Sequence, residues 1–511
     1  MQVGNFSMLS GILLATLLVI IFTWLYRDCK RPKDFPRGPK WLPIIGNLHL
    51  IDTLKKKHGY FFTVLEKLSE EYGPVYGLKL GQNLTVVITD YGIMKDAMSR
   101  EEFQGRPNGF VFTMRTFGEK LGIGFADGPV CTSVRNFTMK TLKDVGLGKG
   151  NMHGHVTEEA SEMVKYLKTH YAETSSKEEN PIALDLLFKL CILNSQWMLI
   201  AGKRFEYEEA KFVQILNLAT SFLQNFDGSG GIISHLPWLR FIAPDASGFT
   251  DLNNAILPMQ QYFQKIIDDH KREFDVNAAH DNLVDLFLAE ISKQKEPSQV
   301  FNEKQLLGTL FDLFMAGMIT LSDAMSNMLH LLAERPELQK ELQEEIDQVI
   351  GRNTLPTMDY YNKMPLMRAF NLETLRFSSI VPIGVARRAM KDTTLLHYRI
   401  PKDTVLVPVL DQVTVRDEEY WNEPQMFKLD RFLSADRAEL KINEREKVPF
   451  GFGKRRCPGD LITSQTMFVF MASILQSFTI LPDEEKERKM EWVEGITFTP
   501  PPFTGSIRAR D

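Results

Sequence analysis

The sequence has few cysteines and no strong excess of charge of one sign. Its 511 residues include four cysteines, Cys29, Cys131, Cys191 and Cys457, which show no paired spacing. So few thiols in a long chain indicate a reducing compartment and argue against a disulfide framework. The formal net charge of −5 argues against a nucleic-acid partner. Internal repeats, low-complexity blocks and linkers are also missing, so we expect one large folded unit where length alone suggests about three domains.

One long hydrophobic run stands near the N-terminus. Residues 9–26 are almost wholly apolar, which is about the length of a helix that crosses a bilayer. Basic residues follow the run directly, at Arg27, Lys30, Arg31 and Lys33, and none precedes it. Because positive residues stay in the cytoplasm, we expect the rest of the chain there. A cleaved signal peptide is the alternative, but the sequence lacks the basic start and small-residue cleavage site that it needs.

These patterns divide the chain into three parts. Residues 1–27 form the predicted membrane anchor, residues 28–47 a basic proline-rich hinge, and residues 48–511 a single folded domain. The prolines exclude a helix in the hinge. Residues 73–90 predict two strands with a turn near 81–83, and most of residues 150–350 have helical periodicity. Short strand-like runs return at 394–400 and 404–408, so the fold class is mainly helical with small sheets.

The most informative segment is FGFGKRRCPG, residues 450–459. It places Cys457 before an apolar helix expected over residues 461–475. A thiol at a helix N-terminus beside Arg455 and Arg456 should ionise readily, and a thiolate is a good ligand for a soft metal. Gly453 and Gly459 let the backbone bend tightly and approach a flat cofactor. A buried cysteine in a turn is the alternative interpretation.

This segment resembles the haem-binding loop of the cytochrome P450 family, Phe-x-x-Gly-x-Arg-x-Cys-x-Gly, at every fixed position. The resemblance covers essentially the whole chain and points to the membrane-bound group that contains vertebrate family 2 and related insect enzymes. It implies the P450 fold and haem b as cofactor, with Cys457 as the iron ligand and Phe450 in the cofactor pocket. In that family the thiolate pushes electron density toward the iron and favours O–O cleavage.

A second match lies in a helix expected over residues 311–327. Ala316-Gly317-Met318-Ile319-Thr320 fits the family pattern Ala-Gly-x-acid-Thr except at the acid. The Thr320 hydroxyl can bond to the Ala316 carbonyl, and with Gly317 this allows a local opening of the helix. The resemblance implies that Ala316, Gly317 and Thr320 are catalytic. With Ile319 at the acid position, either protons arrive through water and another group, or the enzyme acts without full oxygen activation.

Further matches imply a structural network and the residues that hold the haem propionates. Glu373 and Arg376 match Glu-x-x-Arg and face each other on a helix, and Arg431 would complete a buried network that fixes the cysteine loop. The propionate ligands implied by the resemblance are Arg106, Arg135, Arg387 and Arg455. The family has tryptophan at the position of Cys131, whose thiol cannot replace an indole N–H donor.

The resemblance also implies an apolar substrate pocket suited to a lipophilic small molecule. Its expected lining, together with Ala316, is Phe110, Phe112, Phe117, Phe222, Phe226, Leu313, Ile383, Val385 and Phe498. Arg115 in the same early loop could meet a substrate carboxylate, but we expect it on the surface. The apolar segment 235–244 is expected either to pack on the core or to form a second membrane contact.

Together these matches predict a haem-thiolate monooxygenase that inserts one atom of O2 into a lipophilic small molecule, by hydroxylation or epoxidation. The substrate would be a hormone-like terpenoid or steroid, or a xenobiotic. The resemblance implies electrons from NADPH through NADPH–cytochrome P450 reductase, which would dock on basic residues that include Lys140, Lys143, Lys454 and Arg456, with cytochrome b5 as a second candidate partner. The expected location is the endoplasmic reticulum membrane, with a single span and the catalytic domain in the cytoplasm.

Two alternatives remain open. One is an atypical P450 that rearranges or dehydrates its substrate without reductant. The other is a degenerate, non-catalytic protein that binds haem or a ligand, with Ile319 and Cys131 as marks of lost function.

Overall fold

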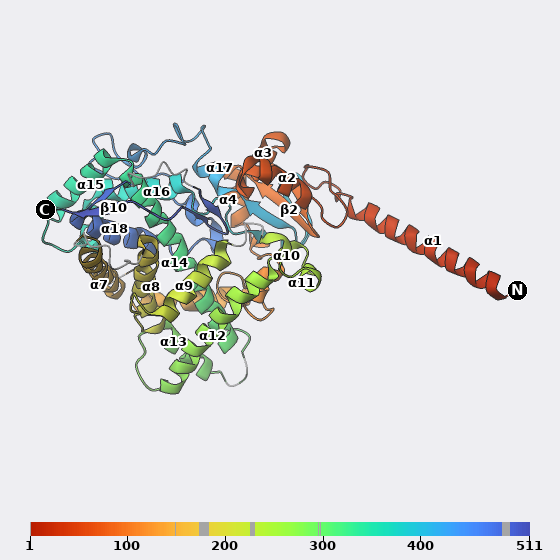
Figure 1. Ribbon diagram of the computed structural model, residues 1–511, viewed down its shortest axis with the longest axis horizontal. Coiled ribbons are helices and arrows are strands. Elements are labelled where there is room, and N and C mark those ends of the chain that lie inside the picture. Colours follow the sequence, from red (N-terminus) through yellow and green to blue (C-terminus); the bar gives the residue numbers. More distant parts are fainter. Residues whose placement is uncertain are drawn as a thin grey trace.

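The computed structural model describes residues 2–148, 150–172, 183–224, 230–294, 296, 298–482 and 491–510. The predicted pocket residue Phe226 lies outside these ranges. A single helix, α1 (Gln2–Asp28), projects from a mainly helical body, and the small sheets next to it lie at the same end of the body (Figure 1). The C-terminus lies at the opposite end of the body. The predicted fold class is therefore confirmed.

Helix α1 has the properties of a membrane span. Within it, the stretch Gly11–Asp28 has a mean hydropathy of 1.6 and is 0% buried. Two other helices, α8 (Leu184–Ala201) and α14 (Glu303–Ala333), are also long and apolar, but each is 72% buried inside the body. We therefore assign α8 and α14 to the protein core and α1 alone to a lipid environment.

The segment after α1 joins the anchor to the body without a helix, as its prolines predict. Arg31 donates hydrogen bonds to the carbonyls of Pro36, Gly38 and Pro39 at 2.9–3.1 Å. At the end of α1, the Asp28 carboxylate forms a buried ion pair with Lys79 in the first strand, at 2.5 Å. The base of the anchor is thus fixed against the sheet.

The sheets are small and lie mostly near the anchor. Four strands pair in the order β1 (Val75–Leu80), β2 (Asn83–Ile88), β6 (Val405–Pro408) and β3 (Arg387–Arg388), with β1–β2 antiparallel and β2–β6 parallel. The predicted turn at 81–83 joins β1 to β2. The other sheets are the pairs β4 (Thr393–Leu395) with β5 (Tyr398–Ile400), β7 (Phe478–Leu481) with β10 (Ser506–Ala509), and β8 (Val493–Glu494) with β9 (Phe498–Thr499).

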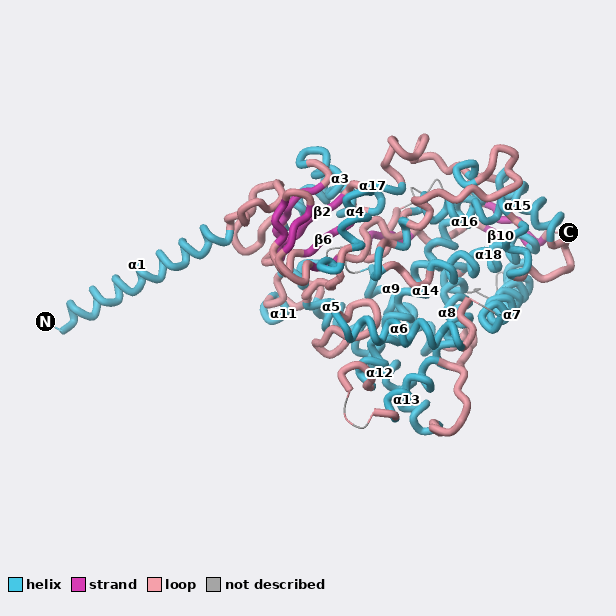
Figure 2. The backbone as a smooth tube through the Cα atoms, turned by 180° about the vertical axis from the view of Figure 1, so that it is seen from behind, coloured by secondary structure: helices cyan, strands magenta, loops and turns pink. Residues whose placement is uncertain are grey.

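Helices make up most of the body, and α14 runs through its middle (Figure 2). The remaining helices are α2 (Leu48–His58), α3 (Phe61–Tyr72), α4 (Tyr91–Ser99), α5 (Phe110–Met114), α6 (Gly128–Asp144), α7 (Gly150–Leu167), α9 (Ala210–Gln224), α10 (Gly231–His235), α11 (Leu239–Ile242), α12 (Phe249–Glu273), α13 (Leu283–Ser292), α15 (Pro336–Val349), α16 (Pro365–Ser378), α17 (Leu410–Thr414) and α18 (Asp460–Ser477). Aromatic rings of α8, α12 and α14 pack together in the core, among them Trp197, Phe263 and Phe314.

The surroundings of Arg115 and of segment 235–244 bear on two expectations from the sequence. Arg115 is buried rather than on the surface, because its guanidinium pairs with Asp312 of α14 at 2.7 Å, and both residues are under 10% exposed. In segment 235–244, Trp238, Phe241 and Ile242 are 47%, 75% and 73% exposed. Part of that segment still packs on the core, since Leu236 is buried and Leu239 contacts the main core. Helix α11 lies at the end of the body from which α1 projects (Figures 1 and 2).

Candidate active site

The cysteine loop is a tight turn held against α4 and followed at once by α18. The Cys457 amide donates to the Phe450 carbonyl at 2.8 Å, which closes the loop on itself. Gly451 and Gly453 have φ angles of 74° and 62°, which favour glycine. A Cβ atom on Gly453 would lie 2.5 Å from the Met98 carbonyl oxygen at the end of α4. The close approach of the two segments therefore requires glycine at position 453.

We infer that the Cys457 thiol faces space inside the body and not the outer surface. The residue is exposed, yet burial raises the pKa of its thiol. Both hold if the sulfur atom faces a hollow inside the body. The Gly459 amide donates to Cys457 Sγ at 3.3 Å, as expected at a helix N-terminus.

The prediction that this thiol ionises readily is wrong for the chain alone. Burial raises the pKa of Cys457 and the nearby Asp460 adds to the effect, while the Gly459 amide, Arg135 and Arg456 oppose it. Arg456 is itself paired with the Asp460 carboxylate. Arg455 turns away and bonds to other groups. A thiolate at this position therefore requires a cation at the sulfur atom, and a metal ion supplies that charge.

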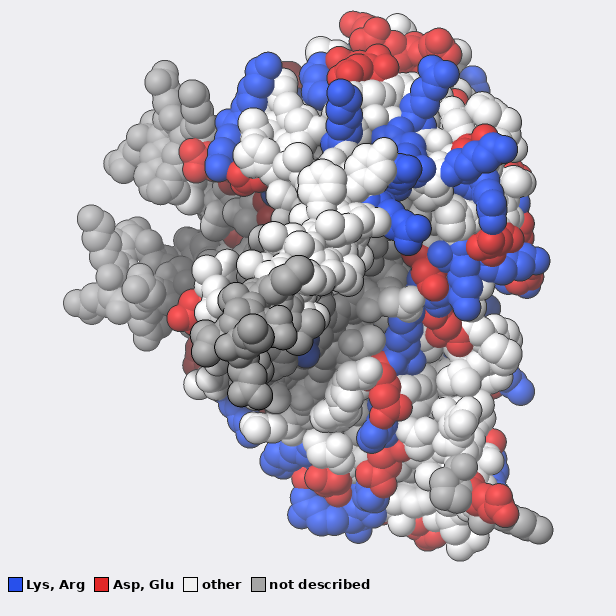
Figure 3. Space-filling model, turned by 90° about the vertical axis from the view of Figure 1, so that its right-hand side faces the viewer, with Lys and Arg blue, Asp and Glu red and all other residues white. Residues whose placement is uncertain are grey.

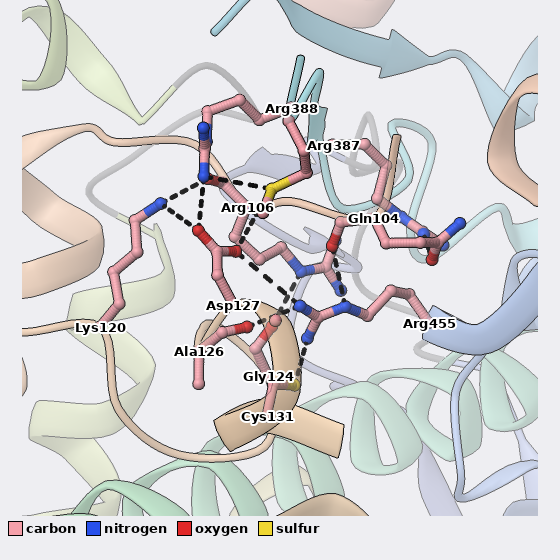
Figure 4. Close-up of polar contacts among 12 residues, drawn as sticks. Gln104, Arg106, Lys120, Gly124, Ala126, Asp127, Cys131, Arg387, Arg388 and Arg455 are labelled. Carbon is pink, nitrogen blue, oxygen red and sulfur yellow. Dashed lines mark hydrogen bonds and ion pairs between the residues drawn. The ribbon is translucent and has the colours of Figure 1, made fainter. Parts of the chain in front are cut away.

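Three buried arginines converge beside the loop (Figure 4). Arg106 donates to the carbonyls of Gly124, Val385 and Ala386 at 2.8–3.0 Å. Arg387 donates to Gln104 Oε1 at 2.7 Å and to the Phe452 carbonyl at 2.9 Å. Arg455 donates to the Ala126 carbonyl at 2.6 Å. Strand pairing and the cysteine loop thus bring together residues that are hundreds of positions apart.

Arg135 acts on Arg106 and Arg387 and so joins them and Arg455 in one arginine cluster, whose charges are poorly balanced. Burial and the neighbouring guanidinium groups lower the pKa of Arg387 to about 9 and also lower the pKa of Arg106. Asp127 is the acid that approaches, at 3.8 Å from Arg455, but it also pairs with Lys120 and Arg388. A bound dianion would relieve the excess positive charge.

Cys131 occupies a place in this cluster that sequence reasoning missed. The residue is buried, and Arg455 Nη1 lies 2.6 Å from its Sγ. The sequence shows only that a thiol replaces a donor. In the structure the same thiol accepts a hydrogen bond from Arg455 and thereby orients that guanidinium.

The distal helix α14 presents one open stripe in an otherwise buried element. The stripe consists of Leu313, Ala316, Gly317 and Thr320. Every other residue from Gln305 to Leu329 is buried. The spacing i, i+3, i+4, i+7 places the four on one face. Thr320 Oγ1 donates to the Ala316 carbonyl at 2.8 Å, as predicted, and the helix is continuous through this point.

Glu373, Arg376 and Arg431 come together in a buried network at α16. Arg376 forks onto both Glu373 carboxylate oxygens at 2.7 and 2.8 Å, and Arg431 Nε lies 3.2 Å from Glu373 Oε1. The amide of Lys428 also donates to Glu373, at 2.8 Å. Arg376 also donates to the carbonyls of Thr414, at the end of α17, and of Pro424 in the following loop. The network therefore ties α16 to the long segment that leads to the cysteine.

The predicted pocket residues occupy different surroundings. Phe222 contacts Phe311 of α14, with ring centroids 6.1 Å apart, and Ile383 and Val385 precede the cluster residue Arg387. Phe498 of β9 stacks on Trp492 at 4.7 Å. Phe112 stacks on Phe125, Phe110 contacts Arg240 of α11, and Phe117 is 49% exposed in a turn.

These residues fit an iron-bearing macrocycle with two carboxylates, as the resemblance implies. Cys457 offers a sulfur ligand whose thiolate form a cation would stabilise. The arginine cluster offers guanidinium forks that need negative charge. The open stripe of α14 offers a flat face without bulky side chains at Ala316 and Gly317. The donor set and the charges suit haem b, whose iron Cys457 would hold and whose propionates the arginines would bind.

Comparisons with known proteins agree with this geometry. Residues 36–506 match the family model described as "Cytochrome P450". Farnesoate epoxidase of Bombyx mori is 32% identical over 96% of this chain and 97% of its own length. Probable cytochrome P450 305a1 of Drosophila melanogaster is 32% identical over 96% and 97%, and cytochrome P450 2A4 of Mus musculus is 29% identical over 98% and 99%. Family match, fold and site together show that the chain belongs to the cytochrome P450 family and is a haem-dependent monooxygenase.

Proposed function

We propose that this enzyme inserts one oxygen atom into a lipophilic small molecule, using electrons from NADPH delivered by NADPH–cytochrome P450 reductase. The observation that carries the proposal is the open stripe of α14, with Leu313, Ala316 and Gly317 beside Thr320, in a chain that also holds the exposed Cys457 before α18. The stripe gives a substrate few polar groups to bind and suits hydrocarbon. Bound haem would supply the oxygen activation.

The chain's own residues have separate tasks in this reaction. Cys457 would hold the iron, and Arg106, Arg135, Arg387 and Arg455 would bind the propionates. Thr320 keeps its hydroxyl hydrogen on the Ala316 carbonyl, which leaves its lone pairs free to accept a hydrogen bond from water or oxygen. Proton transfer at the distal side would run through this hydroxyl.

The substrate class we favour is a neutral or ester-bearing terpenoid-like molecule. The similarity to a farnesoate epoxidase supports a terpenoid chain. Arg115, the one charged residue of the early loop that sequence reasoning offered to a substrate carboxylate, is already neutralised by Asp312. A free carboxylate therefore gains no unpaired cation from Arg115.

Membrane attachment supports delivery of such substrates. Helix α1 and the exposed side chains of Trp238, Phe241 and Ile242 lie at one end of the body, and Trp suits the membrane interface. Viewed from that end, much of the surface around the anchor is uncharged, with basic and acidic groups toward the edges (Figure 3). We infer a single-pass protein of the endoplasmic reticulum with its body in the cytoplasm.

The redox partner would dock at the cysteine side of the molecule. Lys140 and Lys143 are exposed on α6, whose Arg135 bonds to the Arg456 carbonyl in the cysteine loop. Lys454 and Arg456 are already paired with Glu101 and Asp460. The two α6 lysines are therefore the stronger candidates for contacts with an acidic partner, either the reductase or cytochrome b5.

The test is turnover of the membrane-expressed protein with reductase and NADPH, using farnesoic acid and its methyl ester as probes. We expect an oxygenated product that depends on NADPH, with the ester preferred. Preference for the free acid would refute the argument from Arg115. Absence of product from both probes and from a panel of lipophilic substrates would refute the proposed function.

One observation favours a second candidate function, the rearrangement or dehydration of a substrate without reductant. Ile319 is apolar and 1% exposed at the position where the family pattern has an acid. Product formation from an oxygenated substrate in the absence of NADPH would favour this candidate.

A further inference from the structure

Asp323 is a buried acid one turn beyond Thr320 on α14. It is 3% exposed, although carboxylates are rarely buried without a partner. Residues three apart on a helix are surface neighbours, so Asp323 and Thr320 lie next to each other along α14. Asp323 thus follows directly on the open stripe that ends at Thr320.

Hydroxyl groups and charges surround the Asp323 carboxyl. Thr499 Oγ1 of β9 lies 2.9 Å from Asp323 Oδ2, and Thr497 Oγ1 lies 3.4 Å from Thr499 Oγ1. Burial raises the pKa of Asp323 to about 7, and Asp185 adds to this, while Lys189 and the two threonines oppose it. The carboxyl can therefore give up and regain a proton near neutral pH.

A row of polar residues on α8 lies along the same part of α14. Asp185 bonds to Ser326, Lys189 acts on Asp323, and Gln196 reaches Gly317, where a Cβ atom would lie 2.1 Å from its Oε1. Their order shows that α8 runs antiparallel to α14. We call Asp185, Lys189, Gln196, Asp323 and Ser326 the polar seam.

The polar seam is open to water at several points. Asp185, Lys189 and Gln196 are half-buried, although most of α8 is buried. Lys189 Nζ also donates to Thr220 of α9 at 3.3 Å, so the seam reaches a third helix. One end of the seam meets Gly317 in the open stripe, and Asp323 lies between the two ends.

We propose that Asp323, set in the polar seam with Lys189 and Thr499, supplies the protons that Thr320 passes on during oxygenation, in place of the acid that Ile319 replaces. This inference rests on the proposed function. Monooxygenation converts O2, R–H, two electrons and two protons into R–OH and water. The electrons come from NADPH through the reductase. For each proton, the Asp323 O–H bond breaks as an O–H bond forms on Thr320 Oγ1, which leaves the Ala316 carbonyl and gives its own hydrogen to the oxygen atom that becomes water. Solvent in the seam then returns a proton to the Asp323 carboxylate.

In this scheme Asp323 touches neither substrate nor cofactor. It acts through Thr320, to which it supplies protons. The groups that face it are Lys189 and Asp185 from α8 and Thr497 and Thr499 from the C-terminal segment. The apolar Ile319, on the same helix, offers no competing acid.

The test compares Asp323→Asn and Asp323→Glu with the wild-type holoenzyme, reconstituted with reductase and methyl farnesoate. The matched control is Ser322→Ala, since Ser322 is also buried on α14 but its hydroxyl donates to the carbonyl of Ile319, at 3.0 Å, within the same helix. For Asp323→Asn we expect product per NADPH consumed to fall by about 10- to 100-fold, with KM unchanged. Asp323→Glu should recover most of the yield, and Ser322→Ala should match the wild type.

Two pH measurements separate this role from a purely structural one. The wild-type yield should fall as pH rises through about 7, while Asp323→Asn should show a low, flat profile. Because the folded-state pKa of Asp323 is raised, the stability from its protonated form is lost as pH rises toward 7. The thermal midpoint of the wild-type holoprotein should therefore fall relative to that of Asp323→Asn over the same range.

The outcomes are distinguishable. A wild-type yield and pH profile in Asp323→Asn, or an equal loss in Ser322→Ala, would overturn the inference while leaving the monooxygenase intact. No product from the wild type with any lipophilic probe would overturn the proposed function instead. If Asp323→Asn does not fold, Thr499→Val removes the hydrogen bond to the carboxyl without removing the acid, and an unchanged pH profile in that variant would overturn the inference.

Discussion

Replacing Glu373 by glutamine should destabilise the fold far more than the loss of one surface charge. Glu373 is 0% exposed and its carboxylate serves Arg376, Arg431 and the Lys428 amide. The amide of Gln keeps the shape but leaves two guanidinium groups without a counter-charge. Breaking a buried ion pair in this way costs about 3–5 kcal/mol.

The matched control is Glu341→Gln. Glu341 also pairs with an arginine, Arg437, at 3.0 Å, but the two side chains are 45% and 43% exposed. An exposed pair contributes about 0–1 kcal/mol. Urea unfolding of the solubilised holoprotein, followed by haem absorbance, measures both variants in one assay.

We expect the Glu373→Gln midpoint to move well below that of the control at a similar slope. The variant should also lose the thiolate signature before the helices unfold, since the network ties α16 to the segment that carries the cysteine loop. Equal midpoints for the two variants would refute the argument that the buried Glu373 carboxylate stabilises the fold as the counter-charge of two arginines.

Three further predictions concern other parts of the chain. Gly453→Ala should cost about 1–3 kcal/mol in thermal or urea unfolding, because a Cβ atom at 453 meets a backbone carbonyl oxygen at 2.5 Å; an unchanged unfolding midpoint would contradict this. Burial and a neighbouring aspartate raise the pKa of Glu66 to about 9, so the wild type should lose stability relative to Glu66→Gln as pH rises from about 5 to 9; parallel pH profiles would be inconsistent with it. Cys131→Ala removes the acceptor of Arg455 and should speed haem loss to apomyoglobin by about 10-fold, with Cys131→Ser in between.

Local sequence patterns predicted the parts of the fold that depend on local physics. The turn at 81–83, the helix-free hinge and the Thr320 hydrogen bond each follow from residue type and spacing alone. The cysteine loop was also recognisable, because its glycines and its position before an apolar helix are local features.

Tertiary contacts decided what the sequence could not show. Arg455 and Arg456 adjoin Cys457 in sequence, but their side chains bond to Cys131 and Asp460, and the nearby cations do not offset the burial of the thiol. Arg115 was expected on the surface because its partner Asp312 is far away in sequence. The sequence places Asp323 almost a turn beyond Thr320, but Lys189 and Thr499, which surround its carboxyl, come from distant segments.

The central claim is that Cys457 provides the thiolate of a haem monooxygenase. The most direct test is the ferrous–CO difference spectrum of the membrane-expressed protein, with Cys457→His as the control. We predict a strongly red-shifted Soret band for the wild type and a band at shorter wavelength, typical of a neutral ligand, for the variant. A short-wavelength band or no haem in the freshly prepared wild type would contradict the account and favour the degenerate binding protein.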